Sequence, residues 1–229
     1  MTPTSPPSHD PALAAALADG LSALALDLPP AAIDRLLRYL ALIAQWNRVY
    51  NLTAVREPAA MLTQHLLDCL AILPALRRGL GERAGGPLRV LDVGSGAGLP
   101  GVVLAICEPG WEVTCVDAVA KKASFIRQVG AELGLPNLHA THQRVETLGG
   151  EPFQLITSRA FATLADFVAL TRGSLAADGQ WAAMKANLGD DERRTVPQDV
   201  ALFHVEPLGV PGLDATRCLV WMRPTSLPR

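Results

Sequence analysis

The sequence predicts an α/β protein with a mostly parallel, seven-stranded sheet, an antiparallel hairpin at one edge of that sheet, and extra helices at the N-terminal end. Three observations carry this prediction. From Leu88 onward, short apolar stretches alternate with helical ones, which is typical of a parallel sheet. The chain closes on two further β-type stretches separated by Pro- and Gly-rich turns, which indicates a hairpin. Before Leu88 the apolar residues recur at helical spacing.

The ordered part of the chain is expected to begin at Asp10. Residues 1–9 are rich in Pro, Ser and Thr, and they predict a disordered tail. Asp10 fits an N-cap with Pro11 at the first helical position, so a helix is expected to about Leu26. Gly20 lies within it and leaves open a division into two shorter helices.

Two stronger helices follow and complete a helical extension over residues 10–80. The first ends near Trp46 and is predicted by the apolar residues Ile33, Leu36, Leu37, Leu40, Ile43 and Ala44. The second starts at Pro58, with an apolar stripe of Leu62, Leu66, Cys69, Leu70 and Leu73. Gly79–Pro87 is expected to form a flexible join to the second part.

Residues 88–229 are expected to form one domain, a single structural unit. Its predicted strands are Leu88–Val93, Trp111–Val116, Leu138–His142, Phe153–Thr157, Gln180–Lys185, Val200–Pro207 and Arg217–Arg223. The helices between them are Pro100–Cys107, Ala120–Leu133 and one near Thr163–Arg172.

Composition excludes several classes of protein. The 229 residues are 49% hydrophobic and 18% charged, which is typical of a globular chain with one sizeable core. The net charge of −2 excludes a globally basic nucleic-acid binder, so any such surface must be local. Neither an N-terminal signal nor an uninterrupted apolar run of about eighteen residues occurs, so we expect a cytoplasmic protein without a membrane partner. The cysteines lack metal-ligand spacing, which predicts buried thiols and no metal: Cys69, Cys107, Cys115 and Cys218.

One stretch carries the strongest chemical signal. Asp92 lies near the end of a short apolar run, and glycines alternate at 94, 96 and 98 before Pro100 opens a helix. Glycine allows positive φ in a tight turn and lacks the Cβ that would hold a ligand away. A strand, a tight turn and a helix opening bring backbone N–H groups against a small polar ligand.

The ligand of this loop is open between two cofactors. Gly96–Gly101 matches G-x-G-x-x-G, which is a weak indication of a nicotinamide dinucleotide. Asp92, two residues before the first glycine, and the glycine run form the pattern D-x-G-x-G-x-G, which resembles the first motif of Rossmann-like methyltransferases and so favours S-adenosylmethionine. Asp117 ends the second strand, where a carboxylate can accept both ribose hydroxyls of either cofactor.

Other polar residues follow later strands, at the edge where ligands bind in open α/β sheets. Residues 143–146 follow the third strand, near the expected adenine. Arg159 follows the fourth strand, near the donor's methionine end and the substrate, although a surface arginine is the alternative. Lys185 closes the fifth strand. His65 and Asp68 lie three apart on a helix, so they share a face; either they serve the site or their pairing only orients the helix.

Five stretches together resemble the glucose-inhibited division protein B family, whose members methylate guanine N7 in bacterial small-subunit ribosomal RNA. They cover roughly residues 33 to 186, in the family's order. They are Trp46-Asn47-Arg48-Val49-Tyr50-Asn51-Leu52-Thr53, His65-Leu66-Leu67-Asp68, Asp92-Val93-Gly94-Ser95-Gly96-Ala97-Gly98-Leu99-Pro100-Gly101, Arg144-Val145-Glu146 and Ser158-Arg159-Ala160-Phe161. Cys69 departs from the family, which usually has serine there.

The resemblance implies a Rossmann-like methyltransferase fold, S-adenosylmethionine as cofactor and small-subunit ribosomal RNA as partner. Donor contacts are implied at Gly94, Leu99, Val145, Glu146 and Arg159; Gly96 and Asp117 complete the predicted cofactor set from the loop and strand end. No catalytic acid or base is nominated, because guanine N7 carries no proton to remove.

The RNA-facing residues are expected to include Arg48, His65 and Lys185, with further candidates Arg56, Lys121, Lys122 and Arg127. We expect a monomer. The alternatives are a methyltransferase of a small molecule or protein, a nicotinamide-dependent oxidoreductase, and a non-catalytic binding module that kept the fold.

Overall fold

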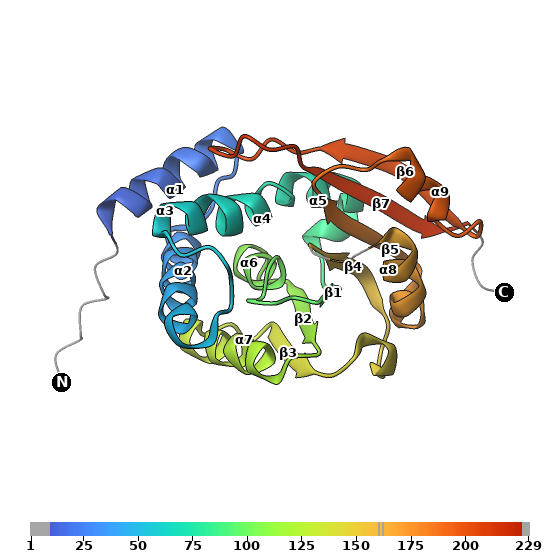
Figure 1. Ribbon diagram of the computed structural model, residues 1–229, viewed down its shortest axis with the longest axis horizontal. Coiled ribbons are helices and arrows are strands. Elements are labelled where there is room, and N and C mark those ends of the chain that lie inside the picture. The colour runs from blue at the N-terminus through green and yellow to red at the C-terminus, as the bar shows by residue number, and fades with distance from the viewer. Residues whose placement is uncertain (1–9, 160, 162, 226–229) are drawn as a thin grey trace.

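A computed structural model of the chain describes residues 10–159, 161 and 163–225. The predicted tail, residues 1–9, lies outside this part, as does Ala160 of one family-like stretch. One sheet runs through the molecule, and its strands follow the order β3-β2-β1-β4-β5-β7-β6. In Figure 1 the sheet fans across the centre, with the first helices at one end and the β6–β7 hairpin at the other.

The strands confirm the predicted mixed sheet. They are β1 Leu88–Val93, β2 Trp111–Asp117, β3 Leu138–His142, β4 Phe153–Ser158, β5 Leu175–Lys185, β6 Val200–Pro207 and β7 Cys218–Pro224. The first five run parallel, whereas β7 is antiparallel to both β5 and β6. β5 begins five residues earlier than predicted, because a register shift against β4 lets Asp178 and Gly179 continue the strand.

Alternate residues of each strand serve opposite faces of the sheet. Val90 belongs to a core shared with the N-terminal helices, α6 Gly101–Cys107 and α7 Ala120–Leu133, whereas Leu91 belongs to a second core under α8 Leu164–Thr171. This is the period-two pattern of a sheet covered on both sides. One further helix, α9 Asp190–Thr195, was not predicted from the sequence.

The first helix is continuous. α1 spans Pro11–Ala23 and passes through Gly20, where an added Cβ would lie 2.5 Å from Leu67 Cδ2. The glycine therefore provides close packing rather than a break. The helix ends before Leu26 because the chain turns at Ala25, whose φ is +51°. Asp10 caps it, accepting the N–H of Ala12 as predicted.

The second helix is longer than predicted and the third is divided. α2 runs from Pro30 to Tyr50 and ends where Asn51 adopts a left-handed conformation. The predicted helix from Pro58 consists of α3 Pro58–Met61, the π-helical turn η1 Leu62–Leu67, α4 Asp68–Leu70 and α5 Leu73–Leu80. Residues 58–85 are apolar and long enough to cross a membrane, but their most apolar window is 72% buried inside the protein, as in a core helix.

The join between the helices and the sheet is ordered, and not the flexible linker expected. Gly79 lies within α5, and a Cβ there would meet the Trp221 ring at 2.3 Å. Gly81–Gly85 form the 3-10 turn η2, where Ala84 accepts the indole N–H of Trp111 at 3.0 Å. The extension and the sheet therefore share one hydrophobic core, which extends from Leu17 to Trp221.

Candidate active site

The glycine stretch forms a tight corner at the carboxyl end of β1. Gly94, Gly96 and Gly98 have φ values of +66°, +60° and +89°, which L side chains rarely adopt. The N–H groups of Gly94 and Ser95 both point to the carbonyl of Val116, at 2.9 and 3.3 Å, so the corner is fastened to β2. We call residues 94–98 the glycine corner.

The glycines of this region serve two purposes. A Cβ on Gly94 would meet nothing within 4 Å, and one on Gly96 would meet only the Gly94 carbonyl at 4.0 Å. Cβ atoms on Gly98 and Gly101 would instead lie 2.4 Å from Val102 Cγ2 and Cys115 Sγ. The first two therefore leave open space where a ligand can approach the backbone, and the latter two allow close packing behind the corner. This open backbone fits the adenosyl donor implied by the sequence.

Asp92 supports the corner from beneath. Its side chain is fully buried, and Oδ2 accepts the N–H of Gly101 at 2.9 Å, while Oδ1 is buried without a partner among the described residues. Burial raises the pKa of Asp92 to about 7, although the Gly101 N–H and the Arg159 charge oppose the increase. The family-like acid thus holds the first turn of α6 against the end of β1.

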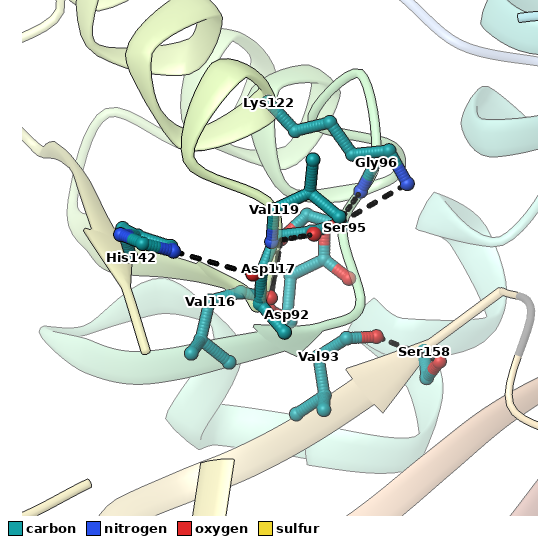
Figure 2. A network of polar contacts seen from close by, with 11 residues as sticks. Asp92, Val93, Ser95, Gly96, Val116, Asp117, Val119, Lys122, His142 and Ser158 are labelled. Carbon is teal, nitrogen blue, oxygen red and sulfur yellow. Dashed lines mark hydrogen bonds and ion pairs between the residues drawn. The ribbon is translucent and has the colours of Figure 1, made fainter. Parts of the chain in front are cut away.

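Asp117 fastens the corner to the residue that precedes α7. Its Oδ2 accepts the Gly96 N–H at 2.9 Å, and its Oδ1 accepts the Val119 N–H at 2.8 Å. Lys122 Nζ lies 3.7 Å from Oδ2. Figure 2 shows this carboxylate between the corner and the first turn of α7. Each carboxylate oxygen has a second lone pair, so these bonds leave Asp117 able to accept ribose hydroxyls.

The remaining predicted donor contacts lie around the same strand ends. Val145 is buried in the short 3-10 turn η3 Val145–Thr147, directly after β3. Glu146 is exposed beside Arg144, whose Nε donates to it at 3.3 Å; a backbone hydrogen bond, and then Arg144, lower the pKa of Glu146. Leu99 is only 3% exposed and its side chain belongs to the core. It therefore helps to shape the loop, and its side chain has little surface for contact with a ligand.

The end of β4 lies directly beside the glycine corner. Ser158 Oγ donates to the Val93 carbonyl at 2.9 Å, which joins the last residues of β4 and β1 (Figure 2). Arg159 follows, and its Nη1 donates to the Gln64 carbonyl at 3.0 Å and lies 3.5 Å from Asp68 Oδ2. Arg159 is thus part of a built site rather than a plain surface arginine.

A cavity of about 320 Å³ opens at this place. We call it the cationic cavity; its charged and polar lining is Gln64, His65, Asp68, Arg159, Lys185 and Arg217. Lys185 Nζ lies 2.6 Å from Glu192 Oε1 and 3.4 Å from the Phe161 carbonyl. The cavity therefore holds more positive than negative charge, which suits an anionic ligand.

His65 and Asp68 both face the site but do not serve as a pair. His65 Nε2 lies 2.9 Å from Thr53 Oγ1, while Asp68 Oδ1 accepts from Arg217 Nε at 2.9 Å. The alternative of a helix-orienting His–Asp pair is thus wrong, because each side chain has its own distant partner. Burial, followed by the Arg159 charge, lowers the pKa of His65 and favours the neutral imidazole.

The family-like stretch around Asn51 is explained by a local network. Asn47 is buried at the end of α2; its Oδ1 accepts the Thr53 N–H at 2.9 Å and its Nδ2 donates to the Val55 carbonyl at 3.1 Å. This network presents Thr53 to His65. The stretch therefore shapes a loop that contacts His65, which in turn lines the cationic cavity.

The predicted RNA-gripping cations are scattered. Arg48 is exposed on the last turn of α2, and Arg56 donates to Asn51 Oδ1 at 3.3 Å. Lys121 donates to the Tyr50 carbonyl at 3.1 Å and so stabilises the end of α2, Lys122 faces Asp117, and Arg127 contacts Ser124. Of the three principal candidates, His65 and Lys185 share the cationic cavity, whereas Arg48 lies apart from it.

Sequence reasoning missed Arg217. The residue lies just before β7, after a Pro- and Gly-rich segment, and joins the cavity through Asp68. Its only sequence signal was a basic residue at the start of a strand predicted to run antiparallel. In such a strand the start, not the end, lies at the ligand-binding edge of the sheet. Among the described residues, no cluster of His, Cys, Asp and Glu could hold a metal ion.

The sheet order, the antiparallel β7 and the open corner at the carboxyl edge define the class as Rossmann-like methyltransferases. Solved structures agree on the fold. A mutant of MtNAS in complex with S-adenosylmethionine superposes with a TM-score of 0.56 at 18% identity, covering 94% of this chain and 80% of that one. TrmN from Thermus thermophilus superposes with a TM-score of 0.52 at 18% identity, covering 71% and 53%.

Sequence comparison identifies the family. The model of the rRNA small subunit methyltransferase G family matches residues 32–220. The ribosomal RNA small subunit methyltransferase G of Methylibium petroleiphilum is 59% identical, covering 92% of this chain and 94% of the relative. Its counterpart in Acidovorax ebreus is 57% identical, covering 92% and 95%. The chain belongs to the rRNA small subunit methyltransferase G family.

Proposed function

We propose that this chain transfers a methyl group from S-adenosylmethionine to N7 of a guanine in 16S ribosomal RNA of the small subunit. The observation that carries the proposal is the juxtaposition of an open glycine corner with a cationic cavity, joined by the Ser158–Val93 hydrogen bond. The corner suits an adenosyl donor, and the cavity suits an anionic polymer beside it. Family membership supports the class of reaction and the RNA.

The donor is assigned to the carboxyl edge of β1, β2 and β3. Gly94 and Gly96 offer backbone that can be approached closely, and Asp117 can accept the ribose hydroxyls. Val145 and Glu146 lie where the adenine is expected, and Arg159 faces the methionine end. When bound, S-adenosylmethionine supplies an electrophilic methyl group on a positively charged sulfur.

The chain's own residues supply orientation rather than proton transfer. Guanine N7 attacks through a lone pair that carries no proton, so the site needs no general base, and none of the described cavity residues has to act as one. Aligning nucleophile and methyl group at about 3–3.5 Å is the main requirement. Arg159 and Lys185 then hold anionic groups, since a cation facing N7 would oppose the positive charge developing there.

The RNA is held by local contacts. A net charge of −2 and few uncommitted cations on the described surface favour modest affinity for naked RNA. We expect this affinity to fall as salt rises, because phosphate contacts release counterions. Binding that does not change with salt would contradict this part of the proposal. We place the reaction in the cytoplasm, where ribosomal subunits are found, and assign it to a monomer.

The test is methyl mapping. Ribosomal RNA and small subunits from a strain lacking the enzyme are incubated with the purified chain and radiolabelled S-adenosylmethionine. Labelled RNA is then cleaved chemically at 7-methylguanine. We expect label at one guanine of the small-subunit RNA, and comparison of the two substrates shows which form is used. Label confined to another nucleotide, or no label from protein that binds the donor in calorimetry, would overturn the proposal.

A further inference from the structure

Asp68 lies between two arginines that come from distant parts of the chain. The carboxylate is 3% exposed; Oδ1 accepts from Arg217 Nε at 2.9 Å, and Oδ2 lies 3.5 Å from Arg159 Nη1. Arg159 follows β4, whereas Arg217 precedes β7, so no shared loop fixes their separation. Asp68 is the common partner that fixes the separation of the two arginines.

The helical segment that precedes Asp68 provides a second contact for Arg159. In the π-helical turn Leu62–Leu67, the N–H of Asp68 bonds to the carbonyls of His65 and Thr63 and bypasses that of Gln64. A regular α-helix would give the Gln64 carbonyl to that N–H. Freed in this way, it accepts Arg159 Nη1 at 3.0 Å. π-helical turns recur at functional sites, and here the turn adds a second anchor for the same guanidinium.

The Gln64 carbonyl and the Asp68 carboxylate hold the arginines and leave some of their N–H donors free. The bonds from Arg159 to Gln64 and Asp68 both involve Nη1, and the Cys69 thiol also lies beside this guanidinium, so part of its planar fork remains able to donate to a ligand. The side chains of Arg159 and Arg217 are 26% and 25% exposed, and both line the cationic cavity. Each guanidinium is thus fixed at one side and open at the other.

We propose that Asp68 is a positioning residue for methyl transfer: it sets the places of Arg159 and Arg217, and through them the alignment of donor and RNA. The inference rests on the proposed function, since it concerns the same site. Asp68 itself touches neither substrate. Its absence would leave two neighbouring cations without their shared anchor, and a misplacement of about 1 Å in an active site can cost about 100-fold in rate.

The test separates positioning from simple stabilisation. We compare the wild type with Asp68→Asn and Asp68→Glu, measuring kcat, the KM for RNA, donor affinity by calorimetry and the thermal midpoint. Glu108→Gln is the matched control, because Glu108 is also a shielded carboxylate paired with an arginine, with its Oε1 2.7 Å from Arg77 Nε, but lies beyond the far end of α6. Both substitutions to amide keep the side-chain size and remove the charge.

We expect Asp68→Asn to lower kcat about 10- to 100-fold, to change donor affinity by less than about threefold, and to shift the midpoint no more than Glu108→Gln. Asp68→Glu should recover part of the rate. The double variant Asp68→Asn/Arg217→Lys should be no slower than its slower parent, since both changes break one unit. A kcat within twofold of wild type, full additivity, or a rate loss that matches the loss of folded protein would overturn the inference.

The experiment also tells this failure apart from failure of the proposed function. A wild type that transfers no methyl group to ribosomal RNA removes both proposals, whereas an active wild type with an equally active Asp68→Asn removes only this one. Should Asp68→Asn not fold, Arg217→Lys alone carries the test, because it weakens the same pair from its exposed side. We then expect a kcat loss of at least about tenfold at unchanged donor affinity; an unchanged kcat would overturn the inference.

Discussion

The glycine corner and the cationic cavity lie side by side but are built in opposite ways. The corner is a matter of backbone: positive φ angles, N–H groups bonded to Val116 and Asp117, and missing Cβ atoms. All its parts lie between residues 92 and 119. The cavity is a matter of side chains, brought from the π-helical turn, the ends of β4 and β5, and the start of β7.

This difference predicts different sensitivity to substitution. The corner excludes atoms, so any added side chain at its open positions competes with the ligand. The cavity depends on charge and on the placement of flexible side chains, so it should tolerate changes of size better than changes of charge. Each region can be tested separately because each has a matched position elsewhere in the chain.

The largest effect is expected at the corner. Gly94→Val should lower donor affinity at least 100-fold, because its side chain would project into the open space before the corner. Holding a non-glycine residue at positive φ costs about 1–2 kcal/mol, so the protein should remain folded. Calorimetric titration with S-adenosylmethionine and urea unfolding measure the two effects.

Gly134→Val is the control for backbone strain. Gly134 has a φ of +60° with nothing within 4 Å of an added Cβ, but it ends α7, away from the ligand-binding edge. It should lose similar stability and keep donor affinity. If Gly94→Val still binds the donor as tightly as Gly134→Val does, the assignment of the corner is wrong.

The next effect is expected in the cavity. Arg159→Ala should reduce methyl transfer about 100-fold or more while changing the free energy of unfolding by only about 1–2 kcal/mol, because the buried Asp68 carboxylate keeps Arg217 as a partner. Arg172→Ala serves as the control. It removes a bidentate pair with Asp199 that lies before the start of β5 and β6, at the edge of the sheet opposite the site. A larger loss of stability than of activity in Arg159→Ala would indicate a structural role instead.

The same contrast explains what the sequence could predict. The order of strands and helices and the glycine corner follow from local patterns, so they were found from residues close together in the chain. The ends of elements were less accurate: the π-helical turn after Met61 and the bulge that lengthens β5 arise from packing and pairing that no local pattern shows. Asp117 was expected to face a ribose, but its bonds to Gly96 and Val119 depend on how two loops meet.

The cavity was predicted only in part for a related reason. Arg159 and Lys185 were found because they end parallel strands, where ligands are expected. Arg217 begins an antiparallel strand and reaches the same edge from the other direction, so the rule for parallel strands passes over it. His65 and Asp68 were correctly placed on one helix face, yet their partners, Thr53 and Arg217, lie too far along the sequence to be foreseen.

The smallest effect is expected on the pH dependence of the free energy of unfolding, through Asp92 beneath the corner. Burial raises the pKa of Asp92 to about 7, whereas an unfolded aspartate titrates near 4. Between these values the folded protein keeps a proton that the unfolded chain has released. Stability should therefore be greatest below pH 4 for this group alone, fall as the pH rises toward 7, and level off above it.

Asp92→Asn should remove that contribution, because the amide does not titrate and its oxygen can still accept the Gly101 N–H. Urea unfolding at pH 5, 6, 7 and 8 should show the variant gaining stability relative to wild type up to about pH 7 and keeping a constant difference beyond it. Asp178→Asn, at an exposed site, controls for loss of one negative charge. A constant difference between Asp92→Asn and wild type across the whole range would mean that Asp92 is ionised throughout, held by the Gly101 N–H and the Arg159 charge. In that case the charge of Arg159 in the cavity, rather than burial, would determine the ionisation state of Asp92.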